Sequence, residues 1–222
     1  MLDAVLFDID GTLIDTGGAG ARSWAWAFEK LYGHPVDIGA FTNAGMTDPE
    51  VGRRTFAGDQ GHEPTKQELA RLLSMYLAIL PDNVQASPGY RVLAGARETL
   101  DRLLDDGVLL GLTSGALEAG AHAKLGRAQL NHYFTFGGYG SDSPDRVELT
   151  RRAVERGEVI AGRALDPKRV FVVGDTPLDL EAAHGAGLLG VGVASGRYSA
   201  EQLAEAGADH VLGSLEEPFP EA

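Results

Sequence analysis

An apolar run that stops abruptly at two aspartates is the feature of this sequence that most constrains its fold. Residues 4–7 read AVLF, Asp8 and Asp10 follow within three positions, and Gly11-Thr12 turns the chain. Such a run is typical of a strand buried in the middle of a parallel sheet. Two carboxylates at its carboxyl end are costly without a cation or a shared proton. They are tolerated beside a divalent metal, or where one is a nucleophile and the other carries a proton. The alternative is a solvated turn with two incidental acids.

Charge and composition exclude several classes of protein. The chain has 19 lysines and arginines against 32 acidic residues, a formal net charge of −13. Phosphate backbones and anionic membrane surfaces would be repelled, so we expect neither nucleic acid nor membrane as a partner. The absence of cysteine excludes disulfides, thiolate catalysis and cysteine metal sites. No basic leader precedes the first expected strand, and no apolar run has the length of a membrane span. We therefore expect a cytoplasmic protein.

Residues 17–87 are patterned as helices and loops, with no convincing strand. Apolar residues recur at helical spacing in 23–32 and 69–77. Thr47 is an N-cap candidate for a helix through 51–56, and Thr65 begins a capping box for the last helix. We expect Pro81 to mark the far end of that helix.

From residue 88 onward, helices and strands alternate. Strands are expected at 108–112, 133–136, 169–173, 188–193 and 210–212, with helices at 92–104, 117–126, 145–156, 180–186 and 200–206. This alternation implies right-handed crossovers and a parallel sheet with helices on both faces. The predicted fold is α/β, with a Rossmann-like core of residues 1–15 and 88–222 and a helical cap inserted at 16–87.

Ligands of such a sheet bind at the carboxyl ends of its strands. Three strands end in reactive or phosphate-friendly residues: Asp8 and Asp10 after the first, Thr113 and Ser114 after the second, and Asp175 and Asp179 after the fourth. Together they would bring four carboxylates, hydroxyls and free backbone N–H groups to one crevice. That combination suits a hard divalent cation and a cluster of anionic oxygens.

These motifs resemble those of a known superfamily. The segment Asp8-Ile9-Asp10-Gly11-Thr12-Leu13, Thr113 after the second strand, and the segment GDTPLD at 174–179 look like the signature motifs of the haloacid dehalogenase-like hydrolases. The inserted helices resemble the C1-type cap of the phosphoglycolate phosphatase and β-phosphoglucomutase-like members. The resemblance covers essentially the whole chain.

The resemblance implies a Mg²⁺-dependent phosphatase that works through an aspartyl-phosphate. Asp8 would attack phosphorus, and Asp10 would protonate the leaving oxygen and later activate water. Mg²⁺ would be held by Asp8, the backbone carbonyl of Asp10 and Asp175, with Asp179 a further ligand or a residue behind the ligands. The substrate would be a small phosphorylated metabolite.

Phosphate binding is where the chain departs from the family pattern. The resemblance assigns the phosphoryl oxygens to Thr113 and to the groups that follow it, including Ser114. The family's lysine after the third strand is missing. Lys168 precedes the fourth strand and is expected at the wrong end of the sheet, and Lys124 is expected to point away from the crevice. Arg146 begins the next helix and is the preferred replacement, because a guanidinium can clamp phosphate bidentately.

Three other functions remain open at this point. A 2-haloacid dehalogenase would leave Asp10, Asp175 and Asp179 without a role, because a halide leaving group needs neither a proton nor a metal. A sugar phosphomutase would keep every core motif. A non-catalytic binding protein is disfavoured because all the required acids are present.

Substrate selection is expected in the cap. Candidate contacts are Arg22, Thr47, Asp48 and Arg53, and phosphoglycolate or a sugar phosphate would fit beneath a closing helical cap. The cap would hinge near residues 15–20 and 85–89. We expect a monomer or a homodimer.

Overall fold

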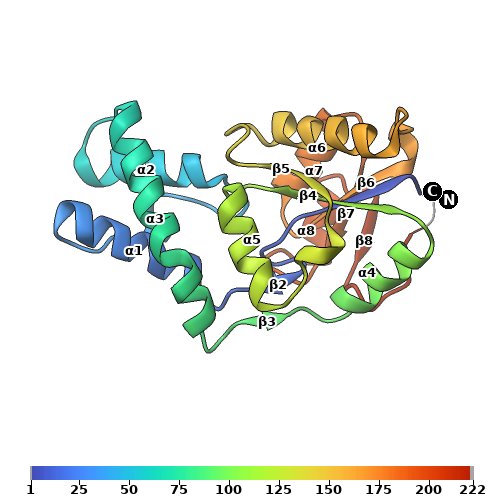
Figure 1. The fold of residues 1–222 in the computed structure, drawn as a ribbon, viewed down its shortest axis with the longest axis horizontal. Coiled ribbons are helices and arrows are strands. Elements are labelled where there is room, and N and C mark those ends of the chain that lie inside the picture. The colour runs from blue at the N-terminus through green and yellow to red at the C-terminus, as the bar shows by residue number, and fades with distance from the viewer. Residues whose placement is uncertain (1, 221–222) are drawn as a thin grey trace.

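A six-stranded parallel sheet forms the centre of the computed structural model, which describes residues 2–220 (Figure 1). The strand order is β5-β4-β1-β6-β7-β8. The strands are β1 (Ala4–Phe7), β4 (Leu109–Ser114), β5 (Phe136–Tyr139), β6 (Val170–Gly174), β7 (Leu189–Val193) and β8 (His210–Leu212). Phe7 at the end of β1 is aligned with Leu112 of β4 and Val173 of β6. The three strands that precede the predicted site residues therefore lie side by side and end together.

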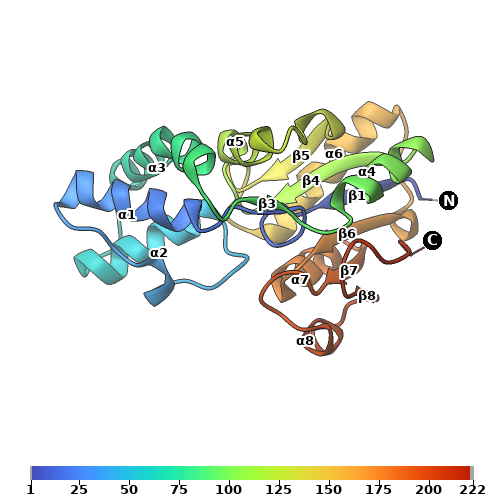
Figure 2. The same cartoon turned by 90° about the horizontal axis from the view of Figure 1, so that it is seen from below.

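Helices cover both faces of this sheet, which confirms the predicted α/β fold (Figure 2). Val5 and Phe7 of β1 face a hydrophobic cluster with α4 and α5, whereas Ala4 and Leu6 face a second cluster with α6 and α7. The core helices are α4 (Ala96–Asp105), α5 (Glu118–Arg127), α6 (Arg146–Ala161), α7 (Pro177–Gly185) and α8 (Ala200–Glu205), with 3-10 turns η2 (Asn131–Tyr133) and η3 (Pro167–Arg169).

Three helices inserted after β1 pack around a hydrophobic cluster of their own, and we call them the cap. They are α1 (Ala19–Tyr32), α2 (Asp48–Gln60) and α3 (Lys66–Ala86), with the 3-10 turn η1 (Ile38–Ala40). The cluster includes Trp24, Phe28, Phe56, Leu72, Tyr76 and Leu80. A short antiparallel ribbon of β2 (Ile14–Asp15) and β3 (Arg91–Val92) pairs the two chain passages between sheet and cap. Within residues 2–220, no helix is long and apolar enough to cross a membrane.

The third strand is the one the sequence misplaces. It was expected at 133–136 but begins at Phe136 and contains Gly137 and Gly138. Aromatic residues favour a strand and glycines disfavour one, so propensity pointed to the wrong segment. Gly138 is needed because α6 packs directly on this strand: a Cβ atom there would overlap the Leu149 carbonyl oxygen.

The last cap helix also departs from expectation. It continues through Pro81 to Ala86 instead of ending at the proline. Leu80 and Val84 are fully buried on either side of Pro81. Burial of this apolar face offsets the lost backbone hydrogen bond.

The close contact at Gly138 gives a test of the fold. Gly138→Ala is expected to lower the free energy of unfolding in urea by about 1–3 kcal/mol, because the helix backbone cannot move aside as a side chain could. Gly20→Ala is the matched control, since a Cβ there meets nothing within 4 Å. The control should be neutral or stabilising by up to about 1 kcal/mol. A Gly138→Ala protein as stable as the parent would contradict the close packing of α6 on β5.

Candidate active site

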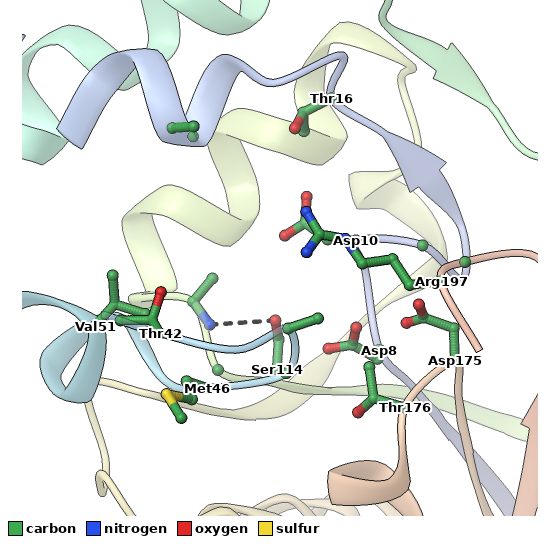
Figure 3. Close-up of a pocket in the computed structure, with 18 of the residues that line it drawn as sticks. Asp8, Asp10, Thr16, Thr42, Met46, Val51, Ser114, Asp175, Thr176 and Arg197 are labelled. Carbon is green, nitrogen blue, oxygen red and sulfur yellow. Dashed lines mark hydrogen bonds between the residues drawn. The ribbon is translucent and has the colours of Figure 1, made fainter. Parts of the chain in front are cut away.

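Three carboxylates from different elements meet at the carboxyl edge of the sheet. Oxygens of Asp8, Asp175 and Asp179 all lie within 4.8 Å of one another. Asp8 follows β1, Asp175 follows β6, and Asp179 is in the first turn of α7. All three side chains are buried, and Figure 3 shows Asp8 and Asp175 close together at the floor of a cleft. The two sequence motifs therefore converge in space.

Glycines make room for this cluster. Gly11 turns the chain after Asp10 with φ +85°, a conformation that other residues rarely adopt. A Cβ atom on Gly11 or on Gly196 would overlap the Asp175 carboxylate. The Ser195 hydroxyl donates to the Gly11 carbonyl at 2.7 Å and ties the loop after β7 to the aspartate loop. The backbone at Gly11 and Gly196 can therefore lie directly against the Asp175 carboxylate, because neither residue has a side chain.

Arg146 supplies the cation within the cluster. Its guanidinium Nη2 lies 3.5 Å from Asp8 Oδ1 and forms an ion pair with Asp179, while Nη1 donates to the Gly45 carbonyl at 2.9 Å. The side chain is almost completely buried. Burial alone would lower the pKa of Arg146, but the carboxylates of Asp179 and Asp8 outweigh it and raise that pKa above its ordinary value.

One guanidinium does not balance three buried carboxylates. Burial and the negative charge of Asp179 raise the pKa of Asp8 well above its ordinary value. The same two causes raise the pKa of Asp175 to about 7. Both shifts report an excess of negative charge in a site that excludes water. A further cation would relieve them.

The donors fit a hard divalent metal such as Mg²⁺. The Oδ1 atom of Asp175 is buried and has no hydrogen-bond partner among the described residues. Asp179 is already engaged, since its Oδ2 accepts from the Thr176 hydroxyl and N–H at 2.7 and 3.0 Å and its Oδ1 pairs with Arg146. Asp8 and Asp175 therefore have oxygens available for a metal, and Asp179 is placed to orient its neighbours.

Asp10 lies apart from this cluster and has its own cation. Lys124 Nζ lies 2.6 Å from Asp10 Oδ2, and the lysine is only 6% exposed. The sequence-based expectation that Lys124 points away from the crevice is therefore wrong. Its position well inside α5 suggested a distant side chain, but a lysine's four-carbon stem spans that distance.

The two hydroxyl residues at the end of β4 point to different surroundings. Thr113 is fully buried, and its hydroxyl is 2.9 Å from the Thr150 hydroxyl of α6. Because successive side chains point to opposite faces, Ser114 is the residue that opens into the cleft. The Ser114 hydroxyl accepts from the Ala116 N–H at 3.3 Å (Figure 3). The Thr113 hydroxyl therefore faces α6 and not the cleft, contrary to expectation, and Ser114 is the expected phosphate ligand of the two that lines the cleft.

The cleft between cap and core has a volume of about 620 Å³. The cap loop before α2 is bonded to the core: Asp48 N–H donates to the Gly115 carbonyl at 2.7 Å, and Leu117 N–H donates to Asp48 Oδ2 at 2.9 Å. A Cβ atom on Gly115 would meet the Met46 carbonyl oxygen, so the two loops approach as closely as backbones can. The cap is seated on the site in this structure.

Most of the expected cap contacts serve other purposes. The Thr47 hydroxyl donates to the Pro144 carbonyl at 3.3 Å, and Arg22 donates to the Gly17 carbonyl at 2.8 Å. Arg53 pairs with Glu50 and Glu63 within the cap. These three side chains hold local structure instead of facing substrate. Asp48 does line the cleft.

Several cleft residues were missed by the sequence analysis. Trp24 and Tyr76 line it from the cap, and their rings stack with centroids 4.2 Å apart. Arg197 lines it from the core and extends beside Asp10 (Figure 3). It follows β7, so applying the strand-end rule to a further strand would have found it. Trp24 and Trp26 are two residues apart and cannot both face one side of a helix, so the sequence predicts that one is core and leaves the other as a candidate for the cleft or an interface. Tyr76 reads as ordinary helix core.

Comparison with known proteins decides the family. A family model described as haloacid dehalogenase-like hydrolase matches residues 2–187. The chain belongs to the haloacid dehalogenase-like hydrolases. The resemblance inferred from its motifs is thereby confirmed, and the chain is an enzyme of the hydrolase class.

Relatives of known name are phosphatases. A phosphoglycolate phosphatase of Synechococcus elongatus is 28% identical over 212 residues, covering 95% of this chain and 92% of the relative. A validoxylamine A 7'-phosphate phosphatase of Streptomyces hygroscopicus subsp. limoneus is 32% identical over 231 residues, covering 98% and 96%.

Solved structures share the fold of this hydrolase. A β-phosphoglucomutase from Clostridium difficile has a TM-score of 0.73 at 19% identity, covering 99% of this chain and 94% of the other. A hydrolase from Pseudomonas syringae has a TM-score of 0.72 at 22% identity, covering 94% and 92%. At these identities the likeness speaks for the architecture alone.

The raised pKa of Asp175 predicts opposite effects of pH and metal on stability. A carboxyl whose folded pKa exceeds its unfolded value destabilises the fold as pH rises between the two values. In EDTA, the melting temperature of Asp175→Asn relative to the parent should therefore increase between pH 4 and pH 7.5. In excess Mg²⁺ at pH 7.5 the order should reverse, because only the parent gains stability from bound metal. An unchanged parent melting temperature on adding Mg²⁺ would contradict the metal assignment.

Proposed function

We propose that this hydrolase is a Mg²⁺-dependent phosphomonoesterase that acts on a small phosphorylated metabolite through an aspartyl-phosphate. The observation that carries the proposal is Asp8, a buried carboxylate at the floor of a cap-covered cleft, with Arg146 on one side and Asp175 on the other. A nucleophile, a cation for phosphate oxygens and a metal ligand are thus together at one point.

In the first step, a carboxylate oxygen of Asp8 attacks phosphorus and forms the acyl phosphate. The ester P–O bond breaks, and its electron pair stays on the leaving oxygen. Asp10 donates a proton to that oxygen, so an alcohol leaves rather than an alkoxide. Asp10 is suited to this part because its carboxylate is 44% exposed to the cleft, whereas that of Asp8 is buried.

In the second step, water attacks the phosphorus of the aspartyl-phosphate. Asp10, now ionised, takes the proton from that water, and the P–O bond to Asp8 breaks. Inorganic phosphate leaves, Asp8 recovers its carboxylate, and Asp10 is again protonated. One carboxyl therefore acts as acid and then as base.

Arg146 is proposed to bind the phosphoryl oxygens together with Ser114 and the N–H groups that follow it. The guanidinium keeps its charge at any working pH and is held between Asp179 and Asp8. Mg²⁺, held by Asp8 and Asp175 with Asp179 behind them, would neutralise phosphate charge as the nucleophile approaches.

The cap is proposed to exclude bulk water and to choose the substrate. We propose that residues 16–87 move as a unit, with hinges at 15–20 and 85–89. These segments are neighbours: the Ser87 hydroxyl donates to the Gly17 carbonyl at 3.2 Å, and Asp15 pairs with Arg91. A cleft of about 620 Å³ suits a small metabolite. The names of the relatives favour a phosphate ester such as phosphoglycolate and favour a phosphatase over a mutase.

Loss of the nucleophile tests this proposal. Asp8→Asn is expected to lower release of inorganic phosphate from phosphoglycolate or 4-nitrophenyl phosphate by at least ~10⁴-fold, because no acyl phosphate can form. Thermal melting should show that the variant folds as the parent does. Asp59→Asn, in the cap and away from the residues that line the cleft, is the matched control and should retain full activity.

EDTA should abolish turnover by the parent, and added Mg²⁺ should restore it. Comparable activity of Asp8→Asn and the parent would contradict the assigned nucleophile. Full activity in EDTA would contradict the assigned metal dependence.

A further inference from the structure

Lys124 is a buried cation directed at the proposed acid–base residue. It extends from α5 of the core, and its ammonium Nζ is 2.6 Å from Asp10 Oδ2. The lysine side chain is 7% exposed, whereas that of Asp10 is 44% exposed. The pair therefore has one sheltered partner and one partner open to the cleft. The sheltered ammonium can fix the direction of a carboxylate that would otherwise rotate freely.

The same ammonium faces groups of the cap. Asp48 and Tyr76 of the cap line the same cleft as Lys124, and together with Asp10 they raise its pKa against the effect of burial. Tyr76, in α3, hydrogen-bonds Asp48 at the start of α2, and both side chains are buried. Stacking on Trp24 holds the Tyr76 ring in place. The cap therefore places the Asp48 carboxylate and the Tyr76 hydroxyl on its side of the cleft, facing the core lysine.

Helix α5 is held by the cap at the end nearest the site. Asp48 Oδ2 accepts from the Leu117 N–H, where α5 begins. At the far end of the same helix, the Tyr90 hydroxyl donates to the Lys124 carbonyl at 2.7 Å. One cap carboxylate thus both anchors the helix that carries Lys124 and attracts its side chain.

Lys124 keeps its charge at this buried position. Burial opposes the ammonium form, but Asp10, Tyr76 and Asp48 outweigh it and raise the pKa of Lys124 well above its ordinary value. Lys124 is also distinct from the phosphate-binding cation, because Arg146 already occupies the position beside Asp8. Its nearest charged partner is the group that would move the proton.

We propose that Lys124 is a positioning residue that holds Asp10 for proton transfer and makes this transfer depend on a seated cap. With the cap in place, Asp48 and Tyr76 fix the lysine, and the lysine fixes Asp10 toward the leaving oxygen. With the cap withdrawn, Lys124 would lose the charge of Asp48 and the Tyr76 hydroxyl nearby, and α5 would lose the carboxylate that accepts from the Leu117 N–H, so Asp10 would no longer be held in one direction. The inference rests on the proposed function, since it takes Asp10 as the acid.

Leaving-group dependence tests this role. Phenyl phosphate and 4-nitrophenyl phosphate fill similar space, but the nitrophenolate leaves readily without a proton and the phenolate does not. Lys124→Met should lower kcat/KM about 10- to 100-fold for phenyl phosphate and less than about threefold for 4-nitrophenyl phosphate. Lys168→Met, which removes an exposed lysine, is the matched control and should change neither value.

Two further variants keep the test sharp. Lys124→Met leaves Asp48 buried without its cation, so Lys124→Met/Asp48→Asn is measured beside it and should show the same selective loss with a recovered melting temperature. Tyr76→Phe keeps the ring stacked on Trp24 and removes only the hydroxyl. It should show a smaller loss confined to phenyl phosphate.

The outcomes separate the inference from the proposed function. Equal losses for both esters, or no loss for either, in a folded Lys124 variant would overturn the positioning role. A selective loss in Lys124→Met with an unchanged Tyr76→Phe would overturn the link to the cap. A parent that releases phosphate from neither ester would instead overturn the proposed function, and the inference with it.

Discussion

The rest of the structure depends on the placing of three buried carboxylates beside a single guanidinium. Asp8, Asp175 and Asp179 are brought within 4.8 Å because parallel strands end at the same edge of the sheet. Burial and their mutual repulsion raise the pKa values of Asp8 and Asp175, and the glycines nearby allow the backbone to close around them. A further cation would relieve this excess of negative charge. In the proposed mechanism, the binding of metal and the binding of a phosphate ester would therefore depend on the same group of charges.

A second group of charges lies where the cap meets the core. Asp48 and Tyr76 meet Lys124 across the boundary between cap and core, and Lys124 meets Asp10. The loop before α2 approaches the loop after β4 so closely that a glycine is required at position 115. Under the proposed function, substrate selection and the positioning of Asp10 would thus depend on the same contacts. A helical insertion that only covered the site would not need buried charges at this boundary.

Sequence reasoning succeeded where local pattern and sheet topology determine the outcome. The apolar run before Asp8 and the alternation after residue 88 predicted the parallel sheet and the edge at which the acids gather. It failed where tertiary packing decides. Nothing local shows that Thr113 faces α6 or that the long stem of Lys124 turns toward Asp10. The glycines of β5 lowered the strand propensity of that segment, although Gly138 is what allows α6 to pack against the strand.

The most direct test of this account is to trap the phosphoryl group on Asp8. Asp10→Asn protein is mixed with 4-nitrophenyl phosphate and Mg²⁺, quenched with acid, digested and analysed by mass spectrometry. The nitrophenolate needs no proton, so the first step should proceed while the second stalls without its base. The account predicts a burst of about one nitrophenolate per enzyme and one phosphoryl group on the peptide that contains Asp8. Steady turnover with no phosphorylated peptide, or a phosphoryl group on another residue, would contradict it.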